Sequence, residues 1–508
     1  MQYSGLVSTP VVVRSTGKDF GTAPYRWYVL LSLTLIYTLN FIDRALLGVL
    51  AQPVITNFGL TDTQFGFLAG PPFALFYALM GIPIALAADR HNRVVIISLS
   101  MALWSLMTAL CGFATGFLFL LIARVGVAVG EAGSTPPSNS LIGDYYRASG
   151  RAKALAIFST GVMLGNALAF LIGGPLGQLP DDTVRAVLGI VGLAGMPEAL
   201  GWGDDFGWRF AFIALGLPGV IFALVVLLTV REPPRGYSDP PGIAQPERTG
   251  IGPTFSLLLR KRSYWYMTAG ASLVAMVGYG FAGFQAPMMQ RLHGIPPGEF
   301  AVRFGLPISA AGAVGTLLAG YLTESLTRRS LRALALLPAL GLLLSAPLYV
   351  LAFNQGGDQL QLAFILWFMA AALHYTYLGA QYTIGQGVVP QSSRASAIAI
   401  MLFIIALVGN GLGPQIVGVL SDGLMKMSLA ERGVADTLTV AACNPKAATN
   451  LAPMLQQVCS EIYAEGLQRS MTLTALVLLP AAACFWMSSR YLEQELVARD
   501  SEADVRPR

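Results

Sequence analysis

Charged side chains interrupt two of the most apolar stretches of the sequence. Asp43 and Arg44 follow Asn40 near the end of an apolar run over residues 28–50, and Arg124 and Glu131 lie in a second run over residues 117–132. We call these five residues the charged island. A charge at bilayer depth is costly, so it faces a bundle interior or a water-filled cavity and is typical of proton and substrate pathways. The alternative is an ion pair that only holds two helices together.

Helix geometry places the island's members at similar depths. With a rise of about 1.5 Å per residue, Asp43 lies roughly 25 Å past Arg26, and Arg124 lies roughly 10 Å from the other end of a span of about 35 Å. Glu131 follows Arg124 by two turns on the same face. Arg124 can therefore contact either acid, and the abandoned carboxylate takes a proton because burial disfavours its charge. We expect Asp43 to be the main proton site and Glu131 a second one, linked to which side is open.

The island also predicts a substrate-binding role for its arginines. On a helix, Arg44 points about 100° away from Asp43. Arg44 either faces a cavity and binds a phosphate or another anion through bidentate bonds, or pairs with Asp43 or Glu131. Asn40, one turn earlier, can orient either charge. Four groups inside later apolar runs complete the expected substrate-binding set: Tyr279, Gln285, His374 and Tyr377. Gln381 is a further polar group in these runs, and a lone His such as His374 is more often a packed residue.

Composition indicates the elements that must position these residues. The chain has 508 residues, of which 55% are hydrophobic and 12% charged, and its mean hydropathy is +0.62. Soluble proteins carry about 25% charged residues, so we predict an all-α membrane protein with twelve transmembrane helices. An apolar patch at residues 186–200 is too short and too Gly-rich to span, and we expect a loop there. The spans are expected to begin near Arg26, Thr63, Val94, Phe117, Lys153, Trp208, Tyr264, Val302, Leu331, Leu362, Ala395 and Met471.

Basic residues predict the orientation. With the N-terminus inside, about 22 Lys and Arg flank the inner ends and about 8 the outer ends, which favours two cytoplasmic termini. The net charge of +5 therefore follows from the span ends and does not indicate nucleic acid. Cys443 and Cys459 share one hydrophilic loop, and a disulfide between them is possible if that loop is outside.

The second half of the sequence repeats the first. Arg151-Ala-Lys-Ala-Leu-Ala-Ile157 returns as Arg394-Ala-Ser-Ala-Ile-Ala-Ile400, and Gly165-Asn166 returns as Gly409-Asn410. Six spans separate the copies, so the halves have the same orientation and form two six-helix pseudo-symmetric bundles, with a substrate site where they meet. We expect a tail at 1–25, a six-helix bundle at 26–230, a cytoplasmic linker at 231–262, a second bundle at 263–491 and a tail at 492–508.

Two groups of motifs resemble known families. Asp89-Arg90-x-x-Arg93 and Gly173-Gly174-Pro175 are similar to the signature loop and the Gly-Pro motif of the major facilitator superfamily. Further elements resemble its Spinster family: Asn40-Phe-Ile-Asp-Arg44, Asp89-Arg-x-Asn-Arg93, Arg124-x-Gly-x-x-x-Gly-Glu-Ala132, Trp208-Arg209 and Arg231-Glu-Pro-Pro-Arg-Gly236.

The resemblance implies a major facilitator fold with the first and fourth spans as neighbours. It also implies lysolipid or sphingolipid-phosphate transport by alternating access, with coupling to protons and an inner-membrane location in bacterial members. The charged residues of the loop are expected to brace a closed inner gate through ion pairs and a helix N-terminus. This gating set comprises Asp89, Arg90, Arg93, Asp144 and Arg147 in the first half, and Glu324 and Arg328 in the second.

Other function classes lack their sequence signatures. There is no Gly-x4-Gly-Lys-Ser/Thr phosphate loop, no Gly-x-Ser-x-Gly elbow, and the three His are too scattered for a metal site. We therefore expect no enzyme and no cofactor beyond a proton gradient. The main alternative is a proton-linked carrier of small organic anions or drugs, in which Arg44 and Arg124 clamp a carboxylate. A membrane enzyme acting on lipids and a non-transporting sensor are the remaining readings. Both halves in one chain make a monomer sufficient.

Overall fold

The computed structural model describes residues 16–204, 206–239 and 250–496, and in these residues helices and loops form without a strand. Twelve helical segments are long and apolar enough to cross a membrane, as predicted. The first six are α1 (Ala23–Val49), α3–α4 (Asp62–Ala69, Pro71–Arg90), α5 (Arg93–Gly112), α6–α7 (Phe117–Glu131, Thr135–Tyr145), α8–η1–α9 (Ala148–Leu168, Ala169–Gly173, Gly174–Leu176) and α12 (Gly207–Thr229). The last six are α14 (Arg262–His293), α15–η2–α16 (Pro297–Phe300, Ala301–Gly305, Leu306–Thr327), α17 (Ala333–Phe353), η3–α18–α19 (Gly357–Gln359, Leu360–His374, Tyr377–Gly387), η4–α20–η5–α21 (Gln391–Ser393, Arg394–Ile405, Ala406–Gly411, Leu412–Glu431) and α23–α24 (Pro453–Leu476, Leu478–Glu495).

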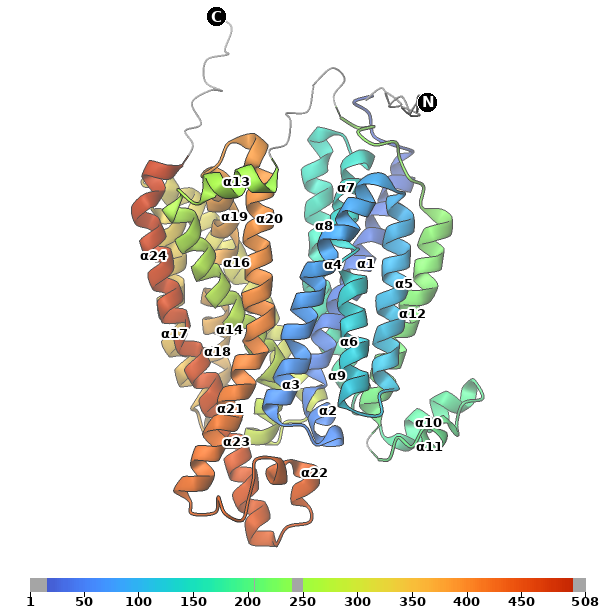
Figure 1. Cartoon of the computed structure of the whole chain (residues 1–508), viewed down its shortest axis with the longest axis vertical. Coiled ribbons are helices and arrows are strands. Elements are labelled where there is room, and N and C mark those ends of the chain that lie inside the picture. The colour runs from blue at the N-terminus through green and yellow to red at the C-terminus, as the bar shows by residue number, and fades with distance from the viewer. Residues whose placement is uncertain (1–15, 205, 240–249, 497–508) are drawn as a thin grey trace, which may run out of the picture.

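Two bundles stand side by side, one for each half of the chain (Figure 1). We call residues 16–230 the N-half and residues 262–496 the C-half. The start of α1 and the end of α24 lie at one end of the molecule, the terminal end, and the opposite end is the distal end (Figure 1). Short helices complete the fold at the two ends: α2 (Ala51–Phe58), α10 (Asp181–Ile190), α11 (Met196–Ala199), α13 (Ile251–Leu258), η6 (Ala441–Cys443) and α22 (Pro445–Ala448).

The internal repeat has a counterpart in the backbone. The fifth and eleventh spans each contain a π-helical turn, η1 and η5, a few residues past or at the repeated Gly-Asn pair. Between the halves, α3 packs on α21, and α9 and η1 pack on α15 and η2. Exchanging the two halves turns the first contact into the second, because the second span corresponds to the eighth and the fifth span to the eleventh. The contacts therefore have the pseudo-twofold relation that the repeat predicts.

The structure adds detail to three expectations. The helix that contains the last span begins at Pro453, well before the predicted span start near Met471, because the distal turns of α23 pack Cys459, Ile462 and Tyr463 into a small apolar cluster with the preceding loop. Residues 186–200 are not among the candidate spans, as predicted, and contain the end of α10, a turn and α11. The linker contains a helix, α13. Residues 1–15 and 497–508 of the predicted tails and 240–249 of the predicted linker lie outside the described residues.

Small residues bring α8 against α1 beside the charged island. A Cβ on Gly161 would lie 2.9 Å from the carbonyl oxygen of Thr34, and one on Gly165 would collide with the backbone at Thr38 and with Phe41. Only glycine permits this close approach. The contact fixes the stretch of α1 that leads into Asp43.

Candidate functional site

The charged island comes together from two helices. Asn40, Asp43 and Arg44 lie on α1, and α6 supplies Arg124 and Glu131. Arg44 Nε donates to Glu131 Oε2 at 2.5 Å, and the exposed fractions of the two side chains are 17% and 0%. Arg44 is thus engaged by Glu131 in this conformation, which was one of its two expected roles.

The predicted proximity of Asp43 and Arg124 is present, but their contact runs through the backbone. Arg124 Nη1 donates to the carbonyl oxygen of Asp43 at 3.4 Å, and both residues are buried. Within the described part of the chain, no ion pair joins the Asp43 carboxylate to a base. The two acids of the island are therefore in different electrostatic states: one is paired and the other is not.

Several polar atoms of the island are buried without a hydrogen bond from any described residue. They are both side-chain polar atoms of Asn40, Nε of Arg124 and Oε1 of Glu131. An unsatisfied buried polar group costs about 1–3 kcal/mol. Such a concentration is expected where a proton, a water molecule or a ligand head group binds during function.

Aromatic rings surround the island's arginines. The guanidinium carbon of Arg44 lies 4.6 Å from the ring centroid of Tyr77, 5.6 Å from that of Phe73 and 5.2 Å from that of Phe41. The Arg124 guanidinium lies 5.1 Å from the centroid of Phe73. Cation–π contacts hold a guanidinium without consuming all of its N–H donors, so Arg44 keeps donors for a second partner.

The C-half contributes a tyrosine to the same place. Tyr279 of α14 is close enough to Arg44 and Tyr77 to interact with them electrostatically, although they belong to the other half. Its exposed fraction is nevertheless 38%, and that of Tyr382 on α19 is 41%. Side chains that lie between the halves and remain exposed show that the halves are not packed together at this level.

The other predicted C-half residues lie in a different setting. His374 is buried, and its ring centroid lies 5.0 Å from that of Tyr375, 6.0 Å from that of Tyr349 and 6.5 Å from that of Tyr377. This aromatic surrounding agrees with the packing interpretation of His374. Gln285 is half-buried, and the buried Gln381 leaves Oε1 without a hydrogen bond from the described residues.

At the terminal end, the predicted gating residue Arg93 fastens the linker to the N-half. Its side chain is 1% exposed; Nη1 lies 2.5 Å from Asp144 and Nε lies 2.6 Å from Glu232. The backbone N–H of Gly236 donates to the second oxygen of Asp144 at 2.8 Å. Arg235 donates to two backbone carbonyls at the end of α4 and just beyond it. In this conformation the signature loop therefore holds residues 231–239.

The remaining predicted gating residues are exposed. Asp89 and Arg90 lie on the surface at the end of α4. The backbone N–H of Arg147 donates to Asp19, and Glu324 pairs with Arg328 one turn away, with both side chains about three-quarters exposed. They stand at the end where the two bundles are apart (Figure 1), and in this conformation they make no hydrogen bond or ion pair across the halves among the described residues.

Hydrogen bonds between the halves gather at the distal end. Both oxygens of Asp62 accept from Arg291 at 2.7 Å, and the two side chains are 0% and 3% exposed. Ser421 donates to Asp62 at 2.6 Å, and the carboxylate of Asp422 accepts the first backbone N–H groups of α3. Arg291 also bonds Gln52 of α2 at 2.8 Å. We call these five residues the distal lock.

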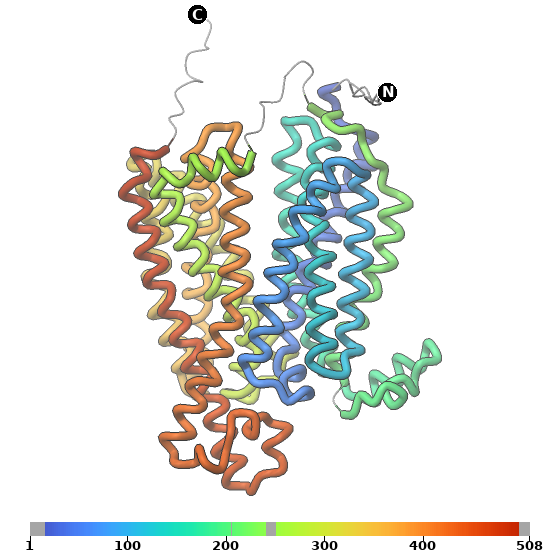
Figure 2. The backbone as a smooth tube through the Cα atoms, in the orientation of Figure 1, coloured from blue at the N-terminus to red at the C-terminus, as the bar shows by residue number. Residues whose placement is uncertain are grey.

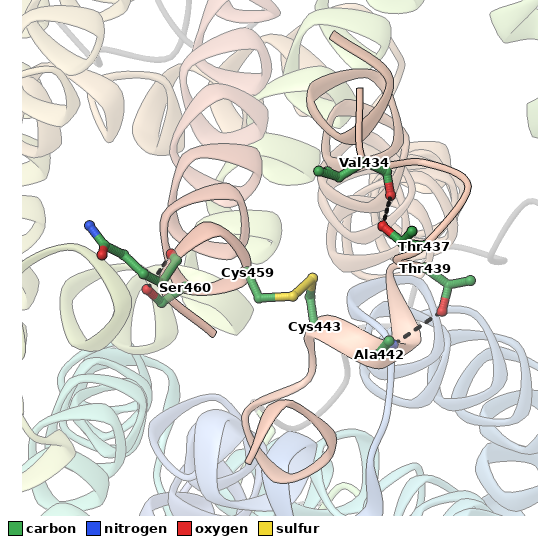
Figure 3. The surroundings of a disulfide bond; sticks show 8 residues. Val434, Thr437, Thr439, Ala442, Cys443, Cys459 and Ser460 are labelled. Atoms are coloured by element: carbon green, nitrogen blue, oxygen red, sulfur yellow. Dashed lines mark hydrogen bonds between the residues drawn. A yellow bond between two sulfur atoms is a disulfide. The ribbon is translucent and has the colours of Figure 1, made fainter. Parts of the chain in front are cut away.

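A cap covers the distal lock. We use this name for residues 432–452, between α21 and α23. Cys443 in the cap and Cys459 in α23 form a disulfide, so the pairing that was left open is present (Figure 3). The amide of the adjacent Asn444 donates to the carbonyl oxygens of Ile55 and Leu60 of the N-half at 3.2 Å. The disulfide therefore holds the cap in the position in which Asn444 bonds to α2 and to the turn after it.

Sequence reasoning missed the distal lock, Tyr77 and Glu232. Asp62 follows Thr61, whose side chain caps α3, and an acid in a first helical turn is usually explained by the helix dipole alone. Arg291 was counted only as a flanking base. Glu232 did have a signal, because it lies within the Arg231–Gly236 motif.

Known proteins resemble this chain in sequence. The Major Facilitator Superfamily matches residues 33–414. An MFS-type efflux pump of Mycolicibacterium smegmatis is 32% identical over 78% of this chain and 85% of its own length. The mouse sphingosine-1-phosphate transporter SPNS2 is 25% identical over 77% of this chain and 69% of its own.

A solved structure resembles it more closely. The crystal structure of a bacterial homologue of the human lysosomal transporter Spinster, inward-facing and unoccupied, has a TM-score of 0.87 and 45% identity, and the match covers 94% of this chain and all of that one. The matched superfamily region, the fold and the motifs of the charged island all indicate the same family. The chain belongs to the Major Facilitator Superfamily and, within it, to the Spinster family of membrane transporters.

Proposed function

We propose that this transporter is proton-coupled and moves a lysolipid or sphingolipid-like amphipathic substrate by alternating access. The observation that carries the proposal is the asymmetry of the charged island. Glu131 is buried and paired with Arg44, whereas Asp43 is equally buried and has no basic partner among the described residues. A charged carboxylate without a partner is strongly disfavoured away from water, so Asp43 is the proton carrier in this conformation.

Movement of Arg124 switches Asp43 between its protonated and its ionised state. It already reaches the backbone oxygen of Asp43, so a small movement of α6 against α1 brings its guanidinium to the carboxylate. The proton then leaves Asp43, because an adjacent positive charge favours the ionised form. Proton release is thereby linked to the relative position of two helices, which is what a coupled carrier requires.

The substrate takes part in this mechanism by competing with Glu131 for Arg44. A phosphate accepts bidentate hydrogen bonds from a guanidinium as a carboxylate does. When Glu131 takes a proton, Arg44 loses its partner and is free to bind an anionic head group. The rings of Phe41, Phe73 and Tyr77 and the exposed Tyr279 give this place the mixed polar and apolar character that an amphipathic molecule fits. The mouse relative is named a sphingosine-1-phosphate transporter, which supports the same class of substrate.

The closed distal end and the separated terminal end correspond to one access state. The distribution of basic residues supports a cytoplasmic terminal end with both termini inside, and the conformation is then inward-facing. For a bacterial protein the membrane is the inner membrane. Both halves of the site come from one chain, so a monomer suffices, and a proton gradient is the only energy source that the mechanism uses.

The second candidate is a proton-linked carrier of small organic anions or drugs. The Mycolicibacterium relative is named an efflux pump, and a guanidinium binds a carboxylate as readily as a phosphate. Arg44 and Arg124 would then clamp a small anion in place of a lipid head group.

Proteoliposomes distinguish these candidates. Labelled lysophospholipid, sphingosine phosphate and a small carboxylate drug are each followed with and without a pH gradient. The proteins are wild type, Asp43→Asn, Glu131→Gln and, as a control, Glu461→Gln, which removes a partly exposed charge. Gradient-driven lipid movement in wild type and the control, lost in Asp43→Asn, supports the proposal. Lipid movement indifferent to the gradient and to Asp43→Asn would reduce the island to a structural ion pair. Movement of the small anion alone would favour the second candidate.

A further inference from the structure

Residues 181–202 form a helical hairpin that the transport mechanism does not use. It consists of α10, a tight turn and α11, and it connects the fifth span to the sixth at the distal end (Figure 1). We call it the distal hairpin. Gly192 in the turn has φ +77°, a conformation that glycine adopts without strain. The turn reverses the chain, so the hairpin has a defined tip at residues 189–193.

One face of the distal hairpin is anchored to the N-half. Val184 and Leu188, one helical turn apart, are buried against Trp202, Phe206 and Ile213 at the start of the sixth span. This packing holds α10 in a fixed place relative to α12. Because the hairpin is packed against the N-half, the exposure of its remaining side chains is a stable feature of the fold.

The tip is apolar and exposed. The exposed fraction is 85% for Ile190, 68% for Val191 and 48% for Leu193, and it is 39% for Val187 and 42% for Leu200. Contiguous exposed apolar surface of this kind marks a binding surface in a soluble region. The exposed fractions of these side chains match those of the lipid-facing residues of the spans, such as Leu118 at 66% on α6.

Buried aromatic side chains fix where the distal hairpin leaves the bundle. The ring of Trp202 lies 6.1 Å from that of Phe113, at the end of α5, and 5.6 Å from that of Phe206, just before α12. The candidate spans α5 and α12 have their distal ends at Gly112 and Gly207. The hairpin therefore leaves the bundle at the distal boundary of these spans, so its apolar tip continues the lipid-facing surface of the N-half.

Charges occupy a separate part of the hairpin. Arg185 pairs with Glu198 of α11 at 2.7 Å and with Asp182 at 3.3 Å, and the side chain of Asp182 is 99% exposed. The pair with Glu198 ties the two helices together, the pair with Asp182 lies within α10, and the apolar tip carries no charged residue. An in-plane helix at a membrane surface has this division between a charged and an apolar side.

The direction in which the hairpin projects completes the argument. In Figures 1 and 2 α10 and α11 extend sideways from the N-half, whereas the cap with α22 extends onward along the long axis of the molecule. The two distal elements are therefore placed differently relative to the bundle: one projects over the surrounding bilayer and the other into the aqueous space beyond it.

We propose that the distal hairpin inserts its apolar tip into the adjacent membrane leaflet, with the acyl chains and head groups of bilayer lipids as its partner. Ile190, Val191 and Leu193 lie in the acyl region, and Arg185, Glu198 and Asp182 remain at the aqueous surface. The hairpin holds the distal end of the fifth span at a constant depth. This inference depends only on a membrane location and is independent of the substrate and of proton coupling.

Spin-label accessibility tests the placement. Single cysteines replace Ile190, Val191 or the control residue Met454, an exposed apolar residue at the start of α23 beside the cap. The free Cys111 and Cys484 are first changed to Ser, and the disulfide is left in place. Each labelled full-length protein is reconstituted in liposomes. Collision with dissolved oxygen, which partitions into lipid, is compared with collision with a water-soluble nickel chelate.

The proposal expects opposite results at the two hairpin positions and at the apolar control position. Oxygen collisions dominate at Ile190 and Val191, and nickel collisions dominate at Met454. Nickel-dominated collisions at both hairpin positions would overturn the proposal. Intermolecular spin–spin broadening at Ile190 that disappears on dilution with unlabelled protein would also overturn it, because the tip would then bind a second copy of the chain. Misfolding does not confuse the comparison, since the side chains of Ile190 and Val191 are mostly exposed and their replacement removes little internal packing.

Discussion

Asp62→Asn should open the distal end of the transporter. The carboxylate of Asp62 accepts two hydrogen bonds from Arg291 and a third from Ser421, and its side chain is fully buried. The amide has the same shape but no charge, and it cannot accept from both guanidinium nitrogens. Arg291 then remains buried without its ion pair, with Gln52, the ring of Tyr463 and the single oxygen of the new amide as partners.

The expected magnitude follows from the burial of the pair. Removing one partner of a buried ion pair costs about 3 kcal/mol or more, because the other charge stays desolvated. The penalty falls on the distal-closed state, since opening lets Arg291 regain water. A loss of about 3 kcal/mol multiplies the ratio of distal-open to distal-closed molecules by about 150. A protein that is closed in about 99 of 100 molecules would then be closed in about 40 of 100.

Distances between spin labels measure this ratio. One label is placed at Thr115, in the exposed distal loop of the N-half, and the other at Met454 of the C-half. The control variant is Glu461→Gln, which removes an acid from a partly exposed pair with Arg432 at the same end. Exposed pairs contribute at most about 1 kcal/mol, or about 5-fold.

A long-distance population should appear in Asp62→Asn and stay at the wild-type level in Glu461→Gln. Identical distance distributions in all three proteins would refute this prediction. The Asp62–Arg291 pair would then add nothing to the closed state, and the apolar contacts between the halves would have to hold it.

Three further outcomes follow from particular contacts. Reduction of the Cys443–Cys459 disulfide, which spans 16 residues, should destabilise the cap by about 3 kcal/mol, seen as faster proteolysis within residues 432–452; an unchanged cleavage rate would contradict a tethering role. Glu232→Ala should cost about 1–3 kcal/mol by removing one partner of a buried arginine, seen as a lower Tm and faster cleavage in the linker, and equal cleavage in both proteins would argue against it. Gly165→Leu should cost about 1–3 kcal/mol or more by forcing α8 away from α1, whereas Gly81→Leu, where a Cβ meets nothing within 4 Å, should leave Tm within about 1 kcal/mol of wild type.

The twelve spans could be predicted because each depends on a local property, a long apolar run. The predicted start at Phe117 coincides with the start of α6. Most of the other predicted span starts lie within a few residues of the observed helix starts. The helix of the last span begins before the predicted start because its distal turns carry polar residues and extend beyond the apolar run. Those turns form a helix because they pack against the cap, and a hydropathy pattern does not detect such packing.

The candidate site could be predicted only in part. Helix rise is constant, so the common depth of Asp43 and Arg124 followed from counting residues. The pairing of Arg44 with Glu131 did not, because it depends on the rotation of two helices about their axes, which neighbouring side chains determine. Asp62 and Arg291 are 229 residues apart, and their contact exists only when the halves dock at the distal end.

Proton movement driven by a lipid gradient is the most direct test of the central claim. Sealed liposomes carry wild-type protein or Asp43→Asn, equal pH on both sides, and lysophospholipid added on one side, and a pH-sensitive dye reports the lumen. Coupling is reciprocal, so the account predicts that the lipid gradient moves protons in wild type and not in Asp43→Asn. Transport of lipid by wild-type protein without any change in lumenal pH would contradict it.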